Sequence, residues 1–208
     1  TKNGCKEAFV GNALGEHELE CIYRLVPCLF DTMQRKDCCG KQVFCKVIEH
    51  YENQHSKLFP YILLSTKYKY NLNEMGLAGE DGYSDPDKFT LNNQTFLLLE
   101  KTEDKVVYKW VYIHGTPNEA KHFSYTLKFF GKKSKMSFEG KVAAIDESFD
   151  TLFEAGKCFA IPHKALIAQL VDEDNEYEYS LEIKNLKEEV KDENYESGIS
   201  DNDEDTKE

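Results

Sequence analysis

Cysteine and histidine are concentrated between Cys5 and His55, and this stretch limits what the chain can fold into more than any other feature. Six of the seven cysteines and three of the six histidines lie there. A disulfide framework is typical of shorter, cysteine-dense secreted chains and does not require histidines at fixed offsets. Zinc does require them, because thiolate sulfur and imidazole nitrogen on short tethers complete its tetrahedral coordination. The stretch therefore predicts structural zinc rather than disulfides.

The spacing separates the candidate ligands into two sets, which are Cys5-x11-His17-x3-Cys21 and Cys28-x9-Cys38-x11-His50-x4-His55. The second set is a complete Cys2His2 complement, whereas the first has three ligands. Cys39 could replace Cys38 as a ligand, because spacing alone cannot separate adjacent cysteines. Cys45 and Cys158 are predicted to be small buried hydrophobic residues, the usual state of a free cysteine.

The net charge of −12 over 208 residues argues against a nucleic-acid surface, which needs lysine and arginine patches. Residues 187–208 hold ten acidic side chains against three lysines, and this composition predicts a disordered acidic tail. No run of about eighteen apolar residues and no signal-peptide core is present, so we expect neither a membrane span nor secretion. A cytoplasmic or nuclear protein, with reduced thiols, is the expectation.

Hydrophobic periodicity predicts an antiparallel β-sandwich after residue 58. Residues 95–99 form a continuous apolar run, typical of a strand buried on both faces. Residues 106–114 alternate and place Tyr108, Trp110 and Tyr112 on one face. That aromatic face is either a dimer surface or a second face of the core. About seven or eight short strands at this spacing are typical of a sandwich.

Shorter elements complete the prediction. A helix is expected over residues 42–51, polar loops over 29–37 and 67–87, a turn over 115–120, and brief helices over 148–153 and 163–170. The expected domains are a double zinc-finger module at 1–57, the sandwich at 58–186 and the acidic tail at 187–208.

The order of these motifs resembles the seven in absentia family of ubiquitin ligases. The resemblance is carried by both sets of Cys/His offsets and by "IYRLVPC" (residues 22–28). It continues through "FLLLEK" (96–101), "HFSYTLKFFGKKSKMSFEG" (122–140), "IDE" (145–147) and the "CFAIP…ALIAQLV" run. It implies two zinc fingers, a TRAF-like substrate-binding sandwich and a homodimer. It also implies ubiquitin transfer to protein substrates by a conjugating enzyme that an upstream RING finger recruits.

Three departures from that family's pattern are visible. No RING and no catalytic centre are found in these residues, so this sequence is expected to supply the substrate-recognition part. The leading cysteine of the first finger would lie before Thr1, so we expect the sequence to start within that finger. The Asp-Trp pair that the family uses to grip a peptide is missing from residues 77–87. A RING-less adaptor that scaffolds partners is the alternative function.

An acidic segment precedes the "FLLLEK" strand, where the resembled family binds its peptide along a sheet edge. It contains Glu80, Asp81, Asp85 and Asp87. These four carboxylates predict a partner segment that carries lysine or arginine. The alternative is that they only keep a long loop solvated.

Overall fold

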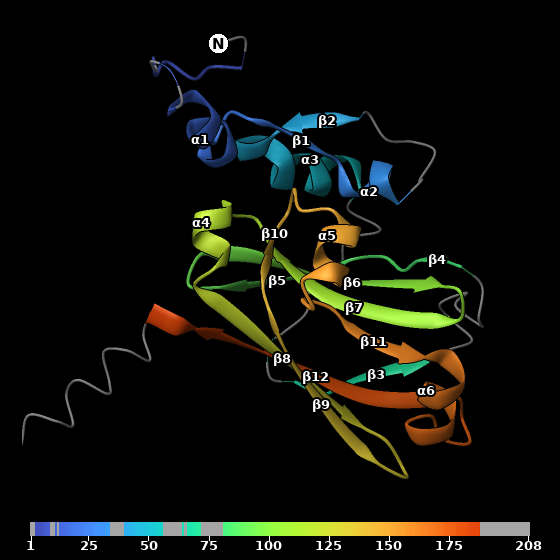
Figure 1. The fold of residues 1–208 in the computed structure, drawn as a ribbon. Helices are drawn as coiled ribbons and strands as arrows, with labels where there is room; N and C mark the ends of the chain where they lie inside the picture. Colours follow the sequence, from blue (N-terminus) through green and yellow to red (C-terminus); the bar gives the residue numbers. More distant parts are fainter. Residues whose placement is uncertain are drawn as a thin grey trace, which may run out of the picture.

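The computed structural model describes residues 3–8, 11, 13–33, 40–55, 64, 66–71 and 81–187. Within these residues, a small Cys/His-rich module lies on top of a two-sheet sandwich (Figure 1). The module consists of α1 (Ala13–Glu20), β1 (Leu25–Pro27), α2 (Leu29–Thr32), β2 (Lys41–Val43), the 3-10 helix η1 (Phe44–Lys46) and α3 (Val47–Gln54).

The first sheet of the sandwich has the strand order β10 (Ala143–Ala144), β7 (Val106–Ile113), β6 (Gln94–Glu103), β4 (Gly82–Tyr83). Two further strands belong to this sheet. The strand β5 (Asp87–Leu91) pairs with β6, and β11 (Phe159–Pro162) pairs with β7. The second has the order β3 (Tyr68–Asn71), β12 (Glu176–Asn185), β8 (Phe123–Phe130), β9 (Lys135–Lys141). All of these pairs are antiparallel except β10 with β7. Three short helices connect the strands: α4 (Pro117–Ala120), α5 (Phe149–Glu154) and α6 (His163–Gln169).

Two tight hairpins fix the register of the first sheet. Asn92 and Asn93 link β5 to β6 with φ of 50° and 61°, and Asp104 and Lys105 link β6 to β7 with φ of 49° and 63°. Two successive positive φ angles are the geometry of a type I′ turn, whose twist matches that of the flanking strands. Asparagine and aspartate tolerate this region better than other side chains, so the local sequence favours these turns.

One hydrophobic core fills the space between the two sheets. It receives Phe89, Phe96 and Val111 from the first sheet and Leu127 and Phe129 from the second, all fully buried. Phe89 and Phe96 stack with ring centroids 5.4 Å apart. The alternation predicted for β7 is confirmed, because Val107, Val111 and Ile113 face this core.

A second hydrophobic core lies on the other face of β6 and β7, beneath the module. Leu97, Leu99 and Trp110 from the sheet pack with Phe30 and Val47 from the module. Trp110 is only 2% exposed there. The aromatic face of β7 is therefore part of a core, which was one of the two predicted alternatives. Residues 96–99 of β6 form a continuous apolar run because both faces of that strand are buried there.

Polar contacts between module and sandwich supplement this core. Arg24 Nε donates to Asp146 Oδ2 at 2.9 Å, and the guanidinium lies 3.8 Å from the centroid of the Phe44 ring. The Phe44 ring stacks in turn on His114, whose Nε2 donates to the Phe44 carbonyl at 2.9 Å. Burial lowers the pKa of His114, and Arg24 lowers it further, so this histidine is neutral and able to remain in the interface.

A charged group is also enclosed between the two sheets. Lys109 and Glu100, opposite each other on β7 and β6, form an ion pair with side chains 2% and 5% exposed. The Tyr70 hydroxyl donates to Glu100 at 2.7 Å, and the Lys109 ammonium lies 4.7 Å from the Tyr70 ring centroid. The hydrogen bond and the ring contact reduce the cost of burying the charges, which unpaired would be large.

Several predicted local elements are wrong in detail. The helix expected over 42–51 is β2, then η1, then α3, which begins only at Val47. Cys45 is exposed on η1 rather than buried, whereas Cys158 is buried as predicted. Part of the loop expected over 29–37 is α2, because Leu29 and Phe30 are apolar and dock in the second core.

Two other segments that were expected to be irregular also contain helices or strands. The loop expected over 67–87 contains β3 and β4, and the expected turn over 115–120 contains α4, which a Thr116–Glu119 capping box starts. Residues 59–65, at the start of the predicted sandwich, lie largely outside the described residues. So do the predicted domain boundary at 57–58 and, except for Lys187, the predicted tail. In the described part of the chain, no helix is long and apolar enough to cross a membrane.

Replacing Asp87 by asparagine should remove the loss of folding stability that ionisation of this buried carboxyl causes as the pH rises. Burial raises the pKa of this carboxyl from 3.8 to about 6, helped by Glu100 and opposed by Lys109. The folded chain therefore binds the proton more tightly than the unfolded chain, and ionisation costs stability as the pH rises from about 4 to about 6. We expect the stability difference between Asp87→Asn and wild type to grow by up to about 3 kcal/mol between pH 4 and pH 7, measured by urea unfolding.

The control is Asp81→Asn, the same chemical change at an exposed position of the preceding segment. It should shift stability by less than about 0.5 kcal/mol at either pH. The buried histidines are the same in wild type and in both variants, so the contribution of their titration to stability cancels when the proteins are compared. A pH-independent difference for Asp87→Asn would show that its carboxyl is solvated in the folded chain.

Candidate metal centres

The second set of predicted ligands converges at the base of the module. Cys28 is the N-cap of α2, His50 lies on α3, and His55 is the C-cap of that helix. The amphipathic α3 buries Val47 and Tyr51 against the sandwich, which fixes the direction of His50. The Tyr51 hydroxyl accepts from the backbone N–H of Leu29 at 3.2 Å and holds the start of α2 against α3.

The geometry of this cluster fits a metal ion. Cys28 Sγ lies 3.4 Å from His50 Nε2 and 3.7 Å from His55 Nε2, and the three ligand atoms lie within 4.8 Å of one another. A tetrahedral ion with sulfur at about 2.3 Å and nitrogen at about 2.0–2.1 Å holds these two atoms about 3.5 Å apart. The two observed sulfur–nitrogen distances lie on either side of this value, so the cluster has room for such an ion.

The electrostatic surroundings also suit metal ligands. Burial lowers the pKa of His50 and of His55, and the neighbouring imidazole lowers that of His55 further, so both rings are neutral near pH 7. A neutral imidazole offers its nitrogen lone pair to a metal, whereas a protonated one does not. The Phe30 ring stacks on His55 with centroids 4.1 Å apart and shields this side of the cluster from water.

The fourth predicted ligand of this set is not placed. Cys38, and Cys39 as its alternative, lie outside the described residues. The backbone on the C-terminal side of that segment returns to the cluster, because the Cys28 N–H donates to the Gly40 carbonyl at 3.1 Å. The choice between the two cysteines stays open, and both remain candidates.

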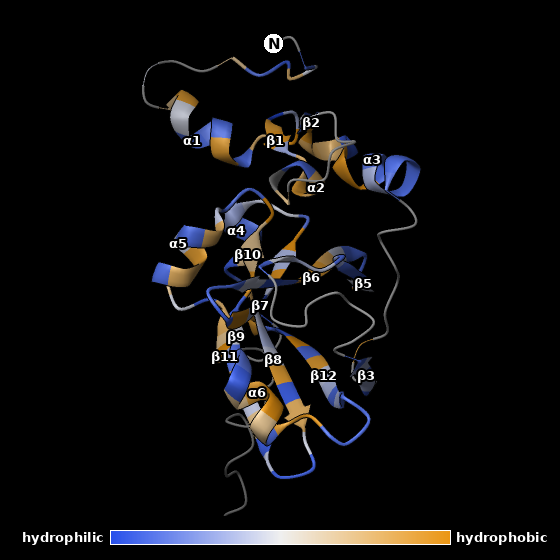
Figure 2. Cartoon of the chain, turned by 90° about the vertical axis from the view of Figure 1, so that its right-hand side faces the viewer, coloured by the Kyte–Doolittle hydropathy of each residue, from blue (hydrophilic) through white to orange (hydrophobic). Residues whose placement is uncertain are grey.

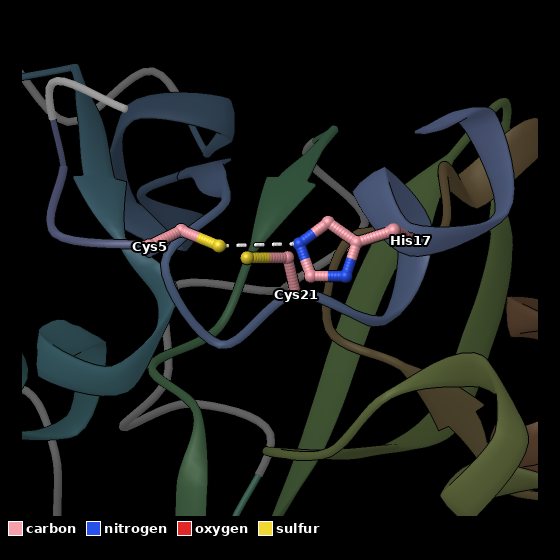
Figure 3. A group of neighbouring side chains, drawn as sticks. All are labelled: Cys5, His17 and Cys21. Atoms are coloured by element: carbon pink, nitrogen blue, oxygen red, sulfur yellow. Dashed lines mark hydrogen bonds between the residues drawn. The ribbon is translucent and has the colours of Figure 1, made fainter. Parts of the chain in front are cut away.

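The first set also comes together, at the outer end of the module (Figure 3). His17 projects from α1, and Cys5 and Cys21 come from the segments on either side of that helix. Cys5 Sγ lies 3.3 Å from His17 Nε2, and all three ligand atoms lie within 4.8 Å of one another. Among the described residues, this group of possible metal ligands consists of Cys5, His17 and Cys21.

Two features support a cation at this first centre. Burial raises the pKa of the Cys21 thiol, a hydrogen bond from the Tyr23 backbone opposes this, and Cys5 raises the pKa further, so a nearby positive ion would favour the Cys21 thiolate. His17 Nδ1 lies 3.3 Å from a Glu7 carboxylate oxygen. A carboxylate on the far nitrogen is the usual way to orient a metal-bound imidazole and to fix its tautomer.

The acidic residues predicted to bind a partner do not share one surface. Glu80 lies outside the described residues, Asp81 is exposed and Asp85 is half-buried. Asp87 lies on β5, where its carboxylate accepts a hydrogen bond from the Tyr179 hydroxyl at 3.2 Å, inside the sandwich. The sequence held a signal for this, since Asp87 is two residues before the buried Phe89 and shares its face of the strand.

The residues that hold the module on the sandwich were not singled out from the sequence as functional. They are Arg24 and Asp146, together with Phe44 and His114. Arg24 and Asp146 occur within the "IYRLVPC" and "IDE" motifs, and 122 positions separate them. Local patterns carry no information about a contact over such a distance, so only the motifs themselves could have drawn attention to this pair.

Comparison with known proteins bears on the sandwich. Residues 87–184 match the family model described as "Sina, TRAF-like domain". That range runs from β5 into β12 and covers most of both sheets. This part of the chain is therefore similar to the TRAF-like domain of seven in absentia proteins, as the sequence motifs predicted. No curated protein matches the chain.

Replacing Cys28 by serine should remove the metal and loosen the module. Trp110 is the single tryptophan and lies in the core that the module covers, so its emission reports the module's docking. We expect Cys28→Ser to lose one metal equivalent by elemental analysis. We also expect a red shift of the emission and a loss of more than about 3 kcal/mol of stability.

The matched control is Cys45→Ser, the same substitution at an exposed cysteine of the same module. It should keep its metal, its emission maximum and its stability. Equal metal content in the two variants would show that Cys28 is not a ligand. Comparing Cys38→Ser with Cys39→Ser in the same way would identify the fourth ligand.

Proposed function

We propose that this chain is the zinc-binding, substrate-recognition region of a RING-type ubiquitin-protein ligase that directs protein substrates to degradation. The observation that carries the proposal is the combination of a TRAF-like sandwich of the Sina type with two Cys/His clusters just before it in the chain. The same order was the basis of the resemblance found in the sequence.

Zinc is the ion that suits both centres. Thiolate and imidazole together favour zinc over magnesium or calcium, which prefer oxygen ligands. The role proposed for it is structural, because the ligands of one centre join α2 to α3 and those of the other join the segments on either side of α1. Cys28, Cys38, His50 and His55 would hold one ion, and Cys5, His17 and Cys21 would contribute three ligands to the other.

The contribution of this region to ubiquitin transfer would be positional. A RING ligase brings a charged conjugating enzyme close to a lysine of the substrate, so its rate advantage comes from proximity and orientation. The sandwich would hold the substrate, and a RING elsewhere in the protein would recruit the conjugating enzyme. Pairing of two sandwiches into a homodimer, and residence in the cytoplasm or nucleus, belong to the same proposal.

The full-length protein provides the test. Incubated with activating enzyme, conjugating enzyme, ubiquitin and ATP, it should form ubiquitin conjugates, and its bound partners should accumulate when the proteasome is inhibited. A matched full-length variant with Cys28→Ser should capture fewer partners. Partner capture without conjugates would favour the alternative, a RING-less adaptor that scaffolds its partners.

The homodimer has a separate measurement. Sedimentation at micromolar concentration should give a mass near twice that of the 24.0 kDa chain, because the resembled sandwiches pair and most soluble oligomers are symmetric dimers. The buried position of Trp110 and Tyr112 means that their rings would not form the contact. A mass that stays at one chain up to the highest soluble concentration would remove the dimer from the proposal.

A further inference from the structure

A groove of about 480 Å³ runs along the junction between module and sandwich. Its floor is the outer face of the first sheet, at Leu99, Trp110 and Tyr112. Leu29 and Met33 of the module form one wall, and residues 145–150, which lead into α5, form the other. The volume is within the range of binding pockets, and the walls belong to both halves of the molecule.

An aromatic track leads out of this groove. The Trp110 ring contacts Tyr83 at one end, with centroids 6.4 Å apart, and Phe149 at the other, with centroids 5.2 Å apart. From Phe149 the track continues to Tyr108 and then to Phe153, which is 52% exposed. A row of rings that passes from a buried floor to the surface presents both flat faces and apolar area to a ligand.

Acidic side chains outnumber basic ones in the lining of the groove, and three of the four are ion-paired, Glu103 with Lys101, Asp146 with Arg24 and Glu147 with Lys157. Its lining includes four carboxylates, from Glu103, Asp146, Glu147 and Asp150, and a single ammonium, from Lys101. Burial raises the pKa of the Tyr83 phenol, Lys101 opposes this shift, and Glu103 and Asp150 add to it, so charges of both signs act on this ring.

One of these carboxylates keeps capacity for a further partner. Asp150 is exposed at the start of α5 and forms no ion pair within the described residues. Asp146, in contrast, is bound to Arg24 through one oxygen, and its other oxygen is buried. An incoming donor could therefore bind Asp150 without displacing Arg24 from Asp146.

A cation already lies close to two of these aromatic rings. The Lys101 ammonium lies 4.2 Å from the Phe149 ring centroid and 5.5 Å from that of Tyr83. A cation over an aromatic face is held by the ring quadrupole, and the guanidinium of arginine adds planar stacking. The groove thus combines aromatic faces for a cation, carboxylates for its N–H groups and an apolar floor for a neighbouring side chain.

We propose that this groove binds a segment of a partner protein in which an arginine or lysine stands beside an apolar side chain. The inference rests on the proposed function, in that it gives the substrate-recognition region a partner chemistry. A second copy of this chain is a poorer occupant, because two chains of net charge −12 would bring acidic rims together.

The probes are pooled peptides of about eight residues with a fixed central residue and varied apolar neighbours. The central residue is arginine in one pool, glutamine in a second and glutamate in a third. The zinc-loaded chain should bind the arginine pool most tightly, with a change in Trp110 emission, since this single tryptophan lines the groove. Added salt should weaken binding, because the carboxylates are partly solvated.

Variants locate the site. Asp150→Asn should weaken binding of the arginine pool about threefold, as expected for a rim charge. Phe149→Leu, which keeps an apolar side chain but removes the ring, should weaken it about fivefold. The matched control is Glu154→Gln, an exposed acid on the same helix that does not line the groove, and it should leave affinity unchanged.

Each of the following outcomes would contradict the proposed binding of a basic segment in the groove. Equal binding of the arginine and glutamine pools would make the occupant simply apolar, and equal loss in Glu154→Gln would reduce the effect to general charge. Binding without a change in Trp110 emission would place it elsewhere, and no binding of any pool would leave the groove without a peptide ligand. None of these results bears on ubiquitin conjugation by the full-length protein, so failure of the inference and failure of the proposed function are distinguishable.

Discussion

Burial of the outer face of β6 and β7 beneath the Cys/His module is the interaction on which the rest of this structure depends. The hydropathy of the chain in Figure 2 shows apolar residues both in the sandwich and in the module that lies above it. Leu97, Leu99 and Trp110 would form an exposed apolar patch if the module were absent. The module in turn is too small to bury a core of its own, and its Phe30 and Val47 are fully buried only because the sheet lies beneath them. Each half therefore supplies the surface that the other lacks.

Inside the sandwich, the Lys109–Glu100 pair imposes a different constraint. Replacing a buried ion pair by apolar residues often stabilises a protein, so the pair is weak evidence for stability. It is stronger evidence for specificity, because the two residues are directly opposite across β6 and β7 and a one-residue slip would leave each charge alone in the core. The hydroxyl of Tyr70 adds β3 to the same arrangement. The neighbouring apolar side chains would tolerate a shifted pairing of the strands. The ion pair disfavours such a shift, and so it helps to select a single register.

The parts of the structure that depend on local periodicity could be predicted from the sequence, and the parts that depend on distant contacts could not. The two faces of β7 and the short helices α5 and α6 follow from alternation and from apolar spacing, and the two Cys/His clusters follow from the Cys/His offsets. The short α2 was missed because four residues are too few to show a helical period, and its helix is stabilised by docking. Asp87 was assigned to a solvated loop because charge was weighed above its position two residues from a buried phenylalanine. The junction groove has no local signal at all, since its walls come from residues more than a hundred positions apart.

A metal bound at the second Cys/His cluster would be coupled to that groove. Leu29 and Met33, which form its wall on the module side, lie one and five residues after Cys28, and the Leu29 N–H donates to the Tyr51 hydroxyl of α3. An ion that ordered Cys28, His50 and His55 would therefore also affect the width of the groove. Linkage then requires reciprocity: if a bound metal raises the affinity of the groove for a peptide, the peptide must raise the affinity of the centre for the metal by the same factor. A metal that is structural with respect to the fold would in this way be regulatory with respect to binding, although it lies outside the groove and contacts no partner.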